Sequence, residues 1–471
     1  MPSINRFAFV TLLAAGIAFA GGRIDQPKAG KMKGATRSAI RSGWISVHLE
    51  GSPAEIGYQH GYLLAPEILE TFQVIQMESV HDSNKDWAFF RKTAREVLWP
   101  KIEKEYRDEL QGILTGMQAH GVRQLDMWDL VAMNASLETG PYYVPFYDKQ
   151  QGTPNAVKPS VPERCSAFVA TGSYTKDGKP VLAHNNWTSY MDGSHWNIMF
   201  DIAPTKGHRI LMDGLPGYIH SADDFGINSA GLMITETTIS QFSGFDPKGI
   251  PEFVRARKAI QYAGSIDEFA NIMKEGNNGG YANNWLIADR RTGEIASLEL
   301  GLKHVNLQRS KDGYFAGSNF PVNEKLIKEE TDFDVKDMGI SANARHVRWD
   351  QLMSENKGKI DAQLAKTFLA DHYDTFDKTQ QPSERTLCGH IDLSPRGIKG
   401  WWGPYGTAGA VQNKVVDANM AASMKISAAM GHACGLNFKA KEHLEKYKEH
   451  DWQKLMRDLP ANPWDDFQAA R

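Results

Sequence analysis

A cysteine that directly follows a dispensable stretch of chain has the clearest chemical potential in this sequence. Cys165 opens the apolar run 166–170 and follows the segment 141–164, whose five prolines predict an exposed linker without regular structure. A cut between Arg164 and Cys165 would make Cys165 a chain N-terminus, with an α-amino pKa of about 7.7–8.0. Such an amine can act as general base for its own thiol. The alternative is a small, buried apolar cysteine without a catalytic role.

A histidine on the next predicted strand could assist this thiol. We expect a strand over 166–170, a turn at 176–179 and a return strand that carries His184. With that turn, His184 stands several residues from the position opposite Cys165. If the loop begins near Gly172 instead, the two residues come within two ladder steps, about 7–8 Å. His184 could then polarise the thiol or bind a substrate carbonyl; otherwise it is an ordinary core histidine.

Acyl transfer also needs donors for an oxyanion, and side-chain amides could supply them. Asn283 and Asn284 start a predicted strand after a pair of glycines. Their alternative role is a polar turn, because Asn and Gly are common turn formers. Two further polar clusters, 223–224 and 235–238, follow the histidine along the chain.

The predicted secondary structure that would position these residues changes along the chain, from helices to strands and back to helices. Ser52-Pro53-Ala54-Glu55 has the cap, proline and acidic residue that start a helix, and 101–119 has helical spacing of apolar residues. Gly57 and Gly61 stand four apart on the first helix, which favours close packing. Beyond residue 340 the pattern is mostly helical. Between these parts we expect strands at 196–202, 209–212, 231–238, 285–288 and 295–299, with helices near 252–263 and 266–274.

Composition sets broad limits on function. The chain has 471 residues, and its 53 basic and 56 acidic residues leave a formal net charge of −3, which argues against a nucleic-acid partner. Cys165, Cys388 and Cys434 are far apart and form no C-x-x-C pair, which argues against a zinc ribbon or a redox dithiol. In an oxidising compartment one pair could bridge and leave the third cysteine free.

The first twenty residues are typical of a secretory signal peptide. Arg6 is followed by the apolar stretch 7–20, which ends in the small-x-small sequence Ala18-Phe19-Ala20. The stretch is short for a membrane span, which needs about 20 residues, although an uncleaved anchor is the alternative. We therefore expect an exported protein in the periplasm, outside the cell or in another extracytoplasmic compartment, with no transmembrane segment after signal removal.

At its polar clusters the chain resembles the phospholipase B-like proteins of the N-terminal nucleophile hydrolase superfamily. The run from Gly51 to Gly61 also resembles the penicillin acyltransferase-like branch of that superfamily. Five blocks in one order carry the main resemblance: Cys165-Ser166-Ala167, His184-Asn185-Asn186-Trp187-Thr188-Ser189-Tyr190, Pro216-Gly217-Tyr218-Ile219-His220-Ser221-Ala222-Asp223-Asp224-Phe225, Ser229-Ala230-Gly231-Leu232 with Thr235-Glu236-Thr237-Thr238, and Tyr281-Ala282-Asn283-Asn284-Trp285.

The resemblance implies an α+β fold, a four-layer αββα sandwich of the N-terminal nucleophile hydrolase type with an added helical N-terminal segment. It implies self-cleavage before Cys165 and hydrolysis of amide or ester acyl bonds, with Cys165 as nucleophile and its freed amine as base. His184 and Asn185 would stand beside them, and Asn283 or Asn284 would hold the oxyanion. The expected substrate-binding residues are Trp187, Asp223, Asp224, Thr237 and Thr238.

The expected organisation has three parts: a signal peptide (1–20), a helical segment ending in the linker (21–164), and a hydrolase core with a mostly helical last third (165–471). The reaction needs no metal or organic cofactor. The expected partner is a small-molecule or lipid acyl substrate, with no nucleic acid, and the sequence leaves the oligomeric state open.

Three other functions remain as alternatives. The first is an acyltransferase or amidase of the penicillin acyltransferase type. The second is an exported binding protein without catalysis, because related bile-salt hydrolases carry an acidic residue where this chain has Trp187. The third is a metallohydrolase, whose candidate ligands have no H-E-x-x-H or comparable spacing: His184, His195, His220 and Asp223.

Overall fold

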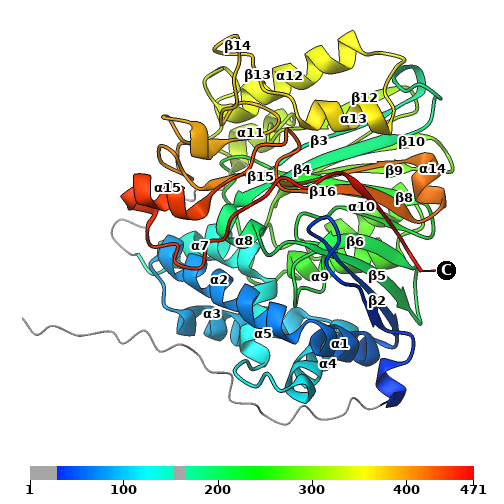
Figure 1. Cartoon of the computed structure of the whole chain (residues 1–471), viewed down its shortest axis with the longest axis vertical. Coiled ribbons are helices and arrows are strands. Elements are labelled where there is room, and N and C mark those ends of the chain that lie inside the picture. Colours follow the sequence, from blue (N-terminus) through cyan, green and yellow to red (C-terminus); the bar gives the residue numbers. More distant parts are fainter. Residues whose placement is uncertain (1–28, 153–164, 471) are drawn as a thin grey trace, which may run out of the picture.

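Two β-sheets lie face to face in the centre of the molecule, with helices covering both outer faces (Figure 1). The computed structural model describes residues 29–152 and 165–470, so the expected signal peptide and the 153–164 part of the expected linker lie outside the described residues. Buried apolar side chains fill the space between the sheets and the space between each sheet and its helices. This arrangement confirms the predicted four-layer αββα sandwich.

Within the described ranges, the larger sheet has nine strands, and all neighbours are antiparallel except the parallel pair β2–β5. Because β2 comes from the N-terminal segment, that segment adds a strand to the core as well as helices. In spatial order the strands are β1 (Thr36–Arg37), β2 (Ile45–Gly51), β5 (Ile198–Pro204), β6 (Ile210–Gly214), β7 (Gly226–Asn228), β8 (Leu232–Thr238), β9 (Asn283–Asp289), β10 (Glu294–Leu300) and β11 (Val305–Ser310).

The smaller sheet draws its strands from the middle and the end of the chain. Its spatial order is β12 (Gly313–Gly317), β3 (Ser166–Thr171), β4 (Val181–Ser189), β15 (Ala408–Asp417), β16 (Lys425–Met430) and β17 (Asp465–Gln468). The expectation of a mostly helical last third is wrong, because β15 and β16 extend the sheet beside the β3–β4 hairpin. Gln412, Asn413 and Lys414 are buried polar residues in the middle of β15 and interrupt its apolar pattern. A separate ribbon pairs β13 (Tyr373–Asp374) with β14 (Thr379–Gln380).

Helices from the N-terminal and middle parts of the chain cover the larger sheet: α1 (Pro53–Leu63), α2 (Ala65–Ser83), α3 (Trp87–Thr93), α4 (Lys104–His120), α5 (Met127–Asn134), α9 (Glu252–Tyr262) and α10 (Ile266–Lys274). Two helices cover the smaller sheet: α12 (Ser341–Glu355) and α13 (Ala362–Leu369). No helix of the described residues is both long and apolar enough to cross a membrane.

Shorter helices join these layers. The α-helical ones are α6 (Ser136–Glu138), α7 (Val144–Gln150), α8 (Tyr190–Gly193), α11 (Glu324–Glu330), α14 (Ala418–Ala422) and α15 (Ala440–Lys446). The 3-10 and π turns are η1 (Ala29–Met32), η2 (Ala94–Leu98), η3 (Trp99–Lys101), η4 (Thr139–Tyr143), η5 (Gly172–Tyr174), η6 (Ile391–Leu393) and η7 (Lys448–His450).

The first part of the predicted linker is helical, which corrects the expectation of an irregular segment from residue 141. Residues 139–150 form η4 and α7, and Tyr142 and Val144 are buried. Pro145 stands at the start of α7, where a residue without an N–H costs no helical hydrogen bond. Pro145 therefore marks the start of a helix here.

The predicted helix start at Ser52 and the close packing at Gly57 are both confirmed. The backbone N–H of Ser52 donates to Oε2 of Glu55 at 2.8 Å, as in a capping box. A Cβ atom on Gly57 would lie 1.9 Å from the carbonyl oxygen of Glu109 in α4. The two helices therefore touch backbone to backbone, which only glycine permits at this position.

Candidate active site

The loop between β3 and β4 sets the distance between Cys165 and His184. It begins at Gly172, which adopts a φ of 63° and bonds the carbonyl oxygen of Gly178 through its N–H at 3.2 Å. The resulting ladder pairs Ala167 with His184. This is the earlier loop start considered in the sequence, and it leaves His184 two ladder steps from Cys165.

The alternation of side chains along β4 then determines which of them lie on the same side of the sheet as the thiol. Continued by one step, the ladder puts Cys165 opposite Asn186, so Cys165, His184 and Asn186 all face the larger sheet. Asn185 faces the opposite way. Its amide donates to two backbone carbonyl oxygens, at the end of α13 and after β14, at 2.8 and 2.9 Å. The structure therefore does not bring Asn185 to the thiol, and gives it the role of a structural tie.

Cys165 is held in an unusual backbone conformation. Its φ is 76°, in the left-handed region that residues with a Cβ rarely adopt. Its carbonyl oxygen accepts a hydrogen bond from Nη1 of Arg345 at 2.5 Å, and its Sγ donates to Oδ1 of Asn186 at 3.8 Å. Only 1% of the residue is exposed. The surrounding chain thus fixes both the backbone and the direction of the thiol.

The thiol is protonated in this uncut chain. Burial raises the pKa of Cys165 well above its ordinary value, and the negative charges of Glu236 and Asp223 raise it further, while the backbone N–H of Trp187 acts in the opposite direction. A thiol of this kind needs a base before it can attack a carbonyl.

His184 is buried and neutral. Its Nδ1 lies 3.6 Å from Oδ2 of Asp223. Burial and the neighbouring charge of Lys414 nevertheless lower the pKa of His184 to about 3. At neutral pH this imidazole can donate one hydrogen bond and accept another, but it is a poor base for the proton of the thiol.

A buried group of charges lies beside His184 and joins the two sheets. Nζ of Lys414, on β15, lies 3.0 Å from Oδ2 of Asp213 on β6 and also contacts Oδ2 of Asp223. Ser221 donates to Asp223 at 2.8 Å. Burial and the charge of Asp223 raise the pKa of Asp213. Burial also acts to raise the pKa of Asp223, but Lys414, His184 and Ser221 together outweigh it and lower that pKa.

The two candidate oxyanion donors stand at the start of β9, in a strand that packs across from β3. Asn284 faces the smaller sheet, and its Oδ1 accepts a hydrogen bond from Ser297 at 2.7 Å. Asn283 is fully buried, and neither atom of its amide has a hydrogen-bond partner within the described residues. Because side chains alternate along a strand, Asn283 faces the helix side of the larger sheet with Trp285 and Ile287, and Asn284 is the one that faces the thiol.

Trp187 faces away from the thiol, on the outer side of the smaller sheet. The guanidinium of Arg345 lies 4.3 Å from the centre of its ring, and a Cβ on Gly389 would lie 2.1 Å from the same ring. Only the backbone of Trp187 therefore reaches Cys165, and its side chain supports the strand from behind.

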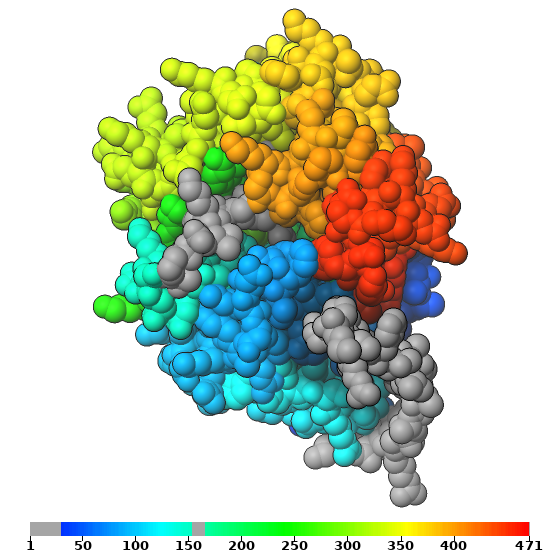
Figure 2. Space-filling view, turned by 90° about the vertical axis from the view of Figure 1, so that its left-hand side faces the viewer, coloured from blue at the N-terminus to red at the C-terminus, as the bar shows by residue number. Residues whose placement is uncertain are grey.

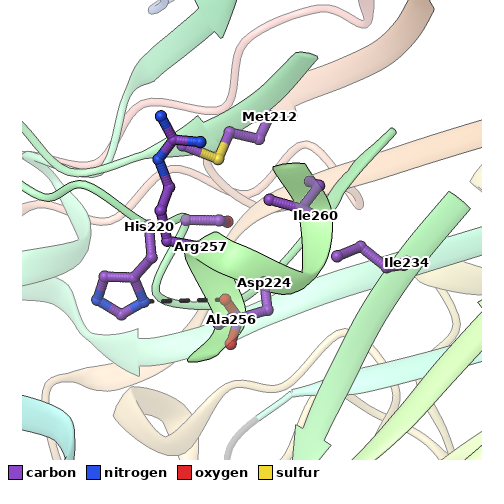
Figure 3. Close-up of a pocket in the computed structure, with 8 residues that line it drawn as sticks. Met212, His220, Asp224, Ile234, Ala256, Arg257 and Ile260 are labelled. Carbon is purple, nitrogen blue, oxygen red and sulfur yellow. Dashed lines mark ion pairs between the residues drawn. The ribbon is translucent and has the colours of Figure 1, made fainter. Parts of the chain in front are cut away.

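The remaining predicted substrate residues divide between two places. Thr237 and Thr238 are consecutive in β8, so Thr237 faces the smaller sheet and Thr238 faces the other way. Their hydroxyls are buried without a hydrogen-bond partner in the described part of the chain. Asp224 turns instead toward His220, with 3.8 Å between its Oδ1 and Nδ1 (Figure 3). The small cavity in Figure 3 is lined by Met212, His220, Ser221, Asp224, Ile234, Ala256, Arg257 and Ile260.

The four ligands of the metallohydrolase alternative do not converge. His184 pairs with Asp223, while His220 lies with Asp224 and Glu252. The ring of His195 bonds the carbonyl oxygen of Met191 at 3.0 Å, and it belongs to neither of these groups. The structure gives no support to a single metal centre formed by the predicted set.

Sequence reasoning missed several residues of the site: Asn186, Asp213, Asn319, Arg345 and Lys414. Asn186 could have been predicted. The strand register that turns His184 toward Cys165 also turns the residue two positions later to the same face. Arg345 donates to the carbonyl oxygen of Cys165 and to Oδ1 of Asn319. Nδ2 of Asn319 in turn donates to the carbonyl oxygen of Thr238. These residues come from distant elements and share no motif with the hairpin.

The comparison with known families agrees with this architecture. The profile of the family described as Phospholipase B matches residues 58–461, which is most of the chain. The chain belongs to the phospholipase B family. The human protein "Phospholipase B-like 1" is 22% identical over 423 residues, covering 80% of this chain and 74% of the human protein. "Phospholipase-B 81" of Drysdalia coronoides is 26% identical and covers 53% of this chain, which spans only 48% of that relative.

Among solved structures, the penicillin V acylase from Agrobacterium tumefaciens is 13% identical, with a TM-score of 0.32. The match covers 56% of this chain and 83% of that one.

Proposed function

We propose that this protein is an exported, self-activating cysteine acyl hydrolase that acts on amide or ester bonds. Membership of the phospholipase B family supports a hydrolase or acyltransferase. The observation that carries the proposal is the placement of Cys165 at the head of β3, in a left-handed conformation, with its thiol facing Asn186 and His184 between the two sheets.

Activation begins with the thiol of Cys165 attacking the carbonyl carbon of Arg164. The peptide C–N bond breaks as a thioester forms on Sγ, and the nitrogen takes up a proton to become an amine. Water then hydrolyses the thioester and releases the new N-terminus. This step supplies the missing base, because the peptide nitrogen of the uncut chain is not basic and the freed α-amine has a pKa of about 7.7–8.0.

Catalysis on a substrate uses the same atoms. The α-amine accepts the proton of the Cys165 thiol, and Sγ attacks the acyl carbonyl. The amide of Asn284 is the better placed of the two predicted donors for the oxyanion, because Asn284 faces the smaller sheet and Ser297 holds its oxygen, which leaves Nδ2 to donate. The amine returns its proton to the leaving group, and water releases the acid from the thioester. His184 binds and orients through a neutral ring.

The substrate class is a small-molecule or lipid acyl compound. The name phospholipase B, which the relatives carry, favours an acyl ester of a phospholipid. Transfer of the acyl group to an amine would use the same thioester, so an acyltransferase differs only in which nucleophile enters last. Extracytoplasmic localisation is part of the proposal, and the signal-like sequence 1–20 supports it.

The proposal is tested by release of free fatty acid from lysophospholipid micelles and from N-acyl amides, with and without an added amine acceptor. We expect Cys165→Ala to abolish release while it keeps the circular dichroism spectrum and unfolding midpoint of the wild type. A thiol-reactive acyl probe should label the wild type at Cys165, mapped by peptide mass spectrometry. Unchanged release by Cys165→Ala would overturn the proposal, and absence of both labelling and release would favour the binding protein without catalysis.

A further inference from the structure

Four potential metal ligands meet outside the candidate active site. They are His372, between α13 and β13, Cys388 and His390, just before η6, and Cys434, after β16. One ligand atom from each residue lies within 4.8 Å of the corresponding atom of every other. In Figure 2 the orange surface of the segment before residue 410 borders the red surface of the C-terminal segment, so these parts of the chain are also neighbours at the surface.

The distances inside this cluster fit a tetrahedral site. Nε2 of His390 lies 3.6 Å from Sγ of Cys388 and 3.5 Å from Sγ of Cys434. Zinc binds sulfur at about 2.3 Å and nitrogen at about 2.0–2.1 Å, so sulfur and nitrogen on neighbouring corners of a tetrahedron lie about 3.5–3.6 Å apart. An ion could therefore sit among these atoms with little movement of the protein.

The second nitrogen of His390 has the support that metal-binding histidines usually have. Its Nδ1 lies 3.6 Å from Oδ1 of Asp392, and the hydroxyl of Tyr190 donates to the same oxygen at 2.6 Å. A carboxylate behind an imidazole orients the ring and strengthens it as a ligand. In addition, Nε2 of His372 is buried with no hydrogen-bond partner among the residues that the structure describes.

The burial of the cluster suits a closed site that an ion can still enter. Cys388 and His390 are fully buried, whereas His372 and Cys434 are half-buried. Two thiolates balance the charge of a divalent ion, and a site of two sulfur and two imidazole ligands leaves no position for a substrate. Soft sulfur ligands also disfavour magnesium and calcium, which prefer oxygen.

We propose that His372, Cys388, His390 and Cys434 bind one structural zinc ion. The ion ties together three segments that are distant in sequence. One of them, the Cys388–His390 loop, packs through Gly389 on the ring of Trp187, behind the strand that carries His184. The site therefore braces the outer face of the catalytic strand without touching the thiol of Cys165. This inference does not depend on the proposed acyl transfer.

The experiment uses the full chain purified without chelator. Metal content is measured by inductively coupled plasma mass spectrometry, and the metal-free protein is titrated with Co²⁺ under reducing conditions. We expect one zinc ion per chain, and with Co²⁺ a thiolate-to-metal charge-transfer band and intense visible bands of a tetrahedral site. The double variant Cys388→Ser with Cys434→Ser should lose the zinc and the charge-transfer band, whereas the control Cys165→Ser should keep both.

Asp392→Asn tests the support behind His390. It keeps all four ligands and should weaken zinc affinity about 10- to 100-fold. Either of two results on the wild type alone would overturn the proposal: a Co²⁺ spectrum without thiolate charge transfer, or a Cys388–Cys434 disulfide as the resting state of the exported protein, found by peptide mass spectrometry before any reductant is added. Because both are read on the wild type, they decide the question even if the double variant does not fold.

Discussion

His184 and the nitrogen of Cys165 are the two groups from which a base for the thiol could come. The imidazole is fully buried, and burial with the charge of Lys414 lowers its pKa to about 3. An α-amine on Cys165 would instead have a pKa of about 7.7–8.0. The two candidates therefore predict different dependences of activity on pH.

The pH profile of kcat/KM separates these candidates. Because the α-amine must be neutral to accept the proton, activity should rise with pH through about 7.7–8.0 and show no inflection near 6.5. His184→Gln keeps a neutral hydrogen-bonding group, so it should lower kcat/KM about 10- to 100-fold, the cost of a weakened buried hydrogen bond, and keep the same inflection. Loss of the inflection in His184→Gln would identify the histidine as the base.

At the residue scale, residue types predicted Cys165 and His184, and the family resemblance added Asp223, which lies beside His184. Lys414 and Arg345 were missed. Cys165 and His184 follow from residue types and one hairpin. Asn185 came from the family resemblance, and the register of β4 turns its side chain away from the thiol. Lys414 and Arg345 contact the site from strands and helices far along the chain, and no spacing rule connects such positions before the fold is known.

At the scale of elements, the contact between α1 and α4 depends on glycine. Gly57→Ala should lower the free energy of unfolding by about 1–3 kcal/mol, because the new methyl group would meet the carbonyl oxygen of Glu109. Gly140→Ala, in η4, is the matched control, since a Cβ there has no neighbour within 4 Å. The control should be neutral or stabilise by up to about 1 kcal/mol. Urea unfolding measures both, and equal losses would contradict this view of the contact.

Element prediction succeeded where local signals and periodicity agreed. The cap at Ser52 and the alternation in β8 both follow from short stretches of sequence. β15 was not predicted, because the buried polar residues 412–414 occupy its centre. The helical structure of 139–150 was not predicted either, because Pro145 at the start of a helix resembles a proline in a linker. Both errors arise from tertiary contacts. The fold supplies hydrogen-bond and packing partners for these residues, and the local sequence does not show them.

For the whole molecule, Lys414 joins the two sheets through the carboxylates of Asp213 and Asp223. Lys414→Met leaves these carboxylates buried without their cation, so we expect a loss of about 3–5 kcal/mol in the free energy of unfolding. The loss should be larger at pH 9 than at pH 5, because a carboxylate that can take up a proton escapes the cost of burial. Urea unfolding at both pH values measures it.

The matched variant adds Asp213→Asn and Asp223→Asn to Lys414→Met. With no charge left in the group, most of the lost stability should return, and the difference between the two pH values should disappear. A triple variant as unstable as Lys414→Met would show that the charges are not the cause of the loss.

The most direct test of the account is the mass of the purified chain, measured intact and followed by N-terminal sequencing. For the wild type we predict two polypeptides, the second of which begins Cys165-Ser166-Ala167. Cys165→Ala should give one uncut chain. A wild type that remains a single chain while it hydrolyses acyl substrates at full rate would contradict the claim that Cys165 becomes its own base.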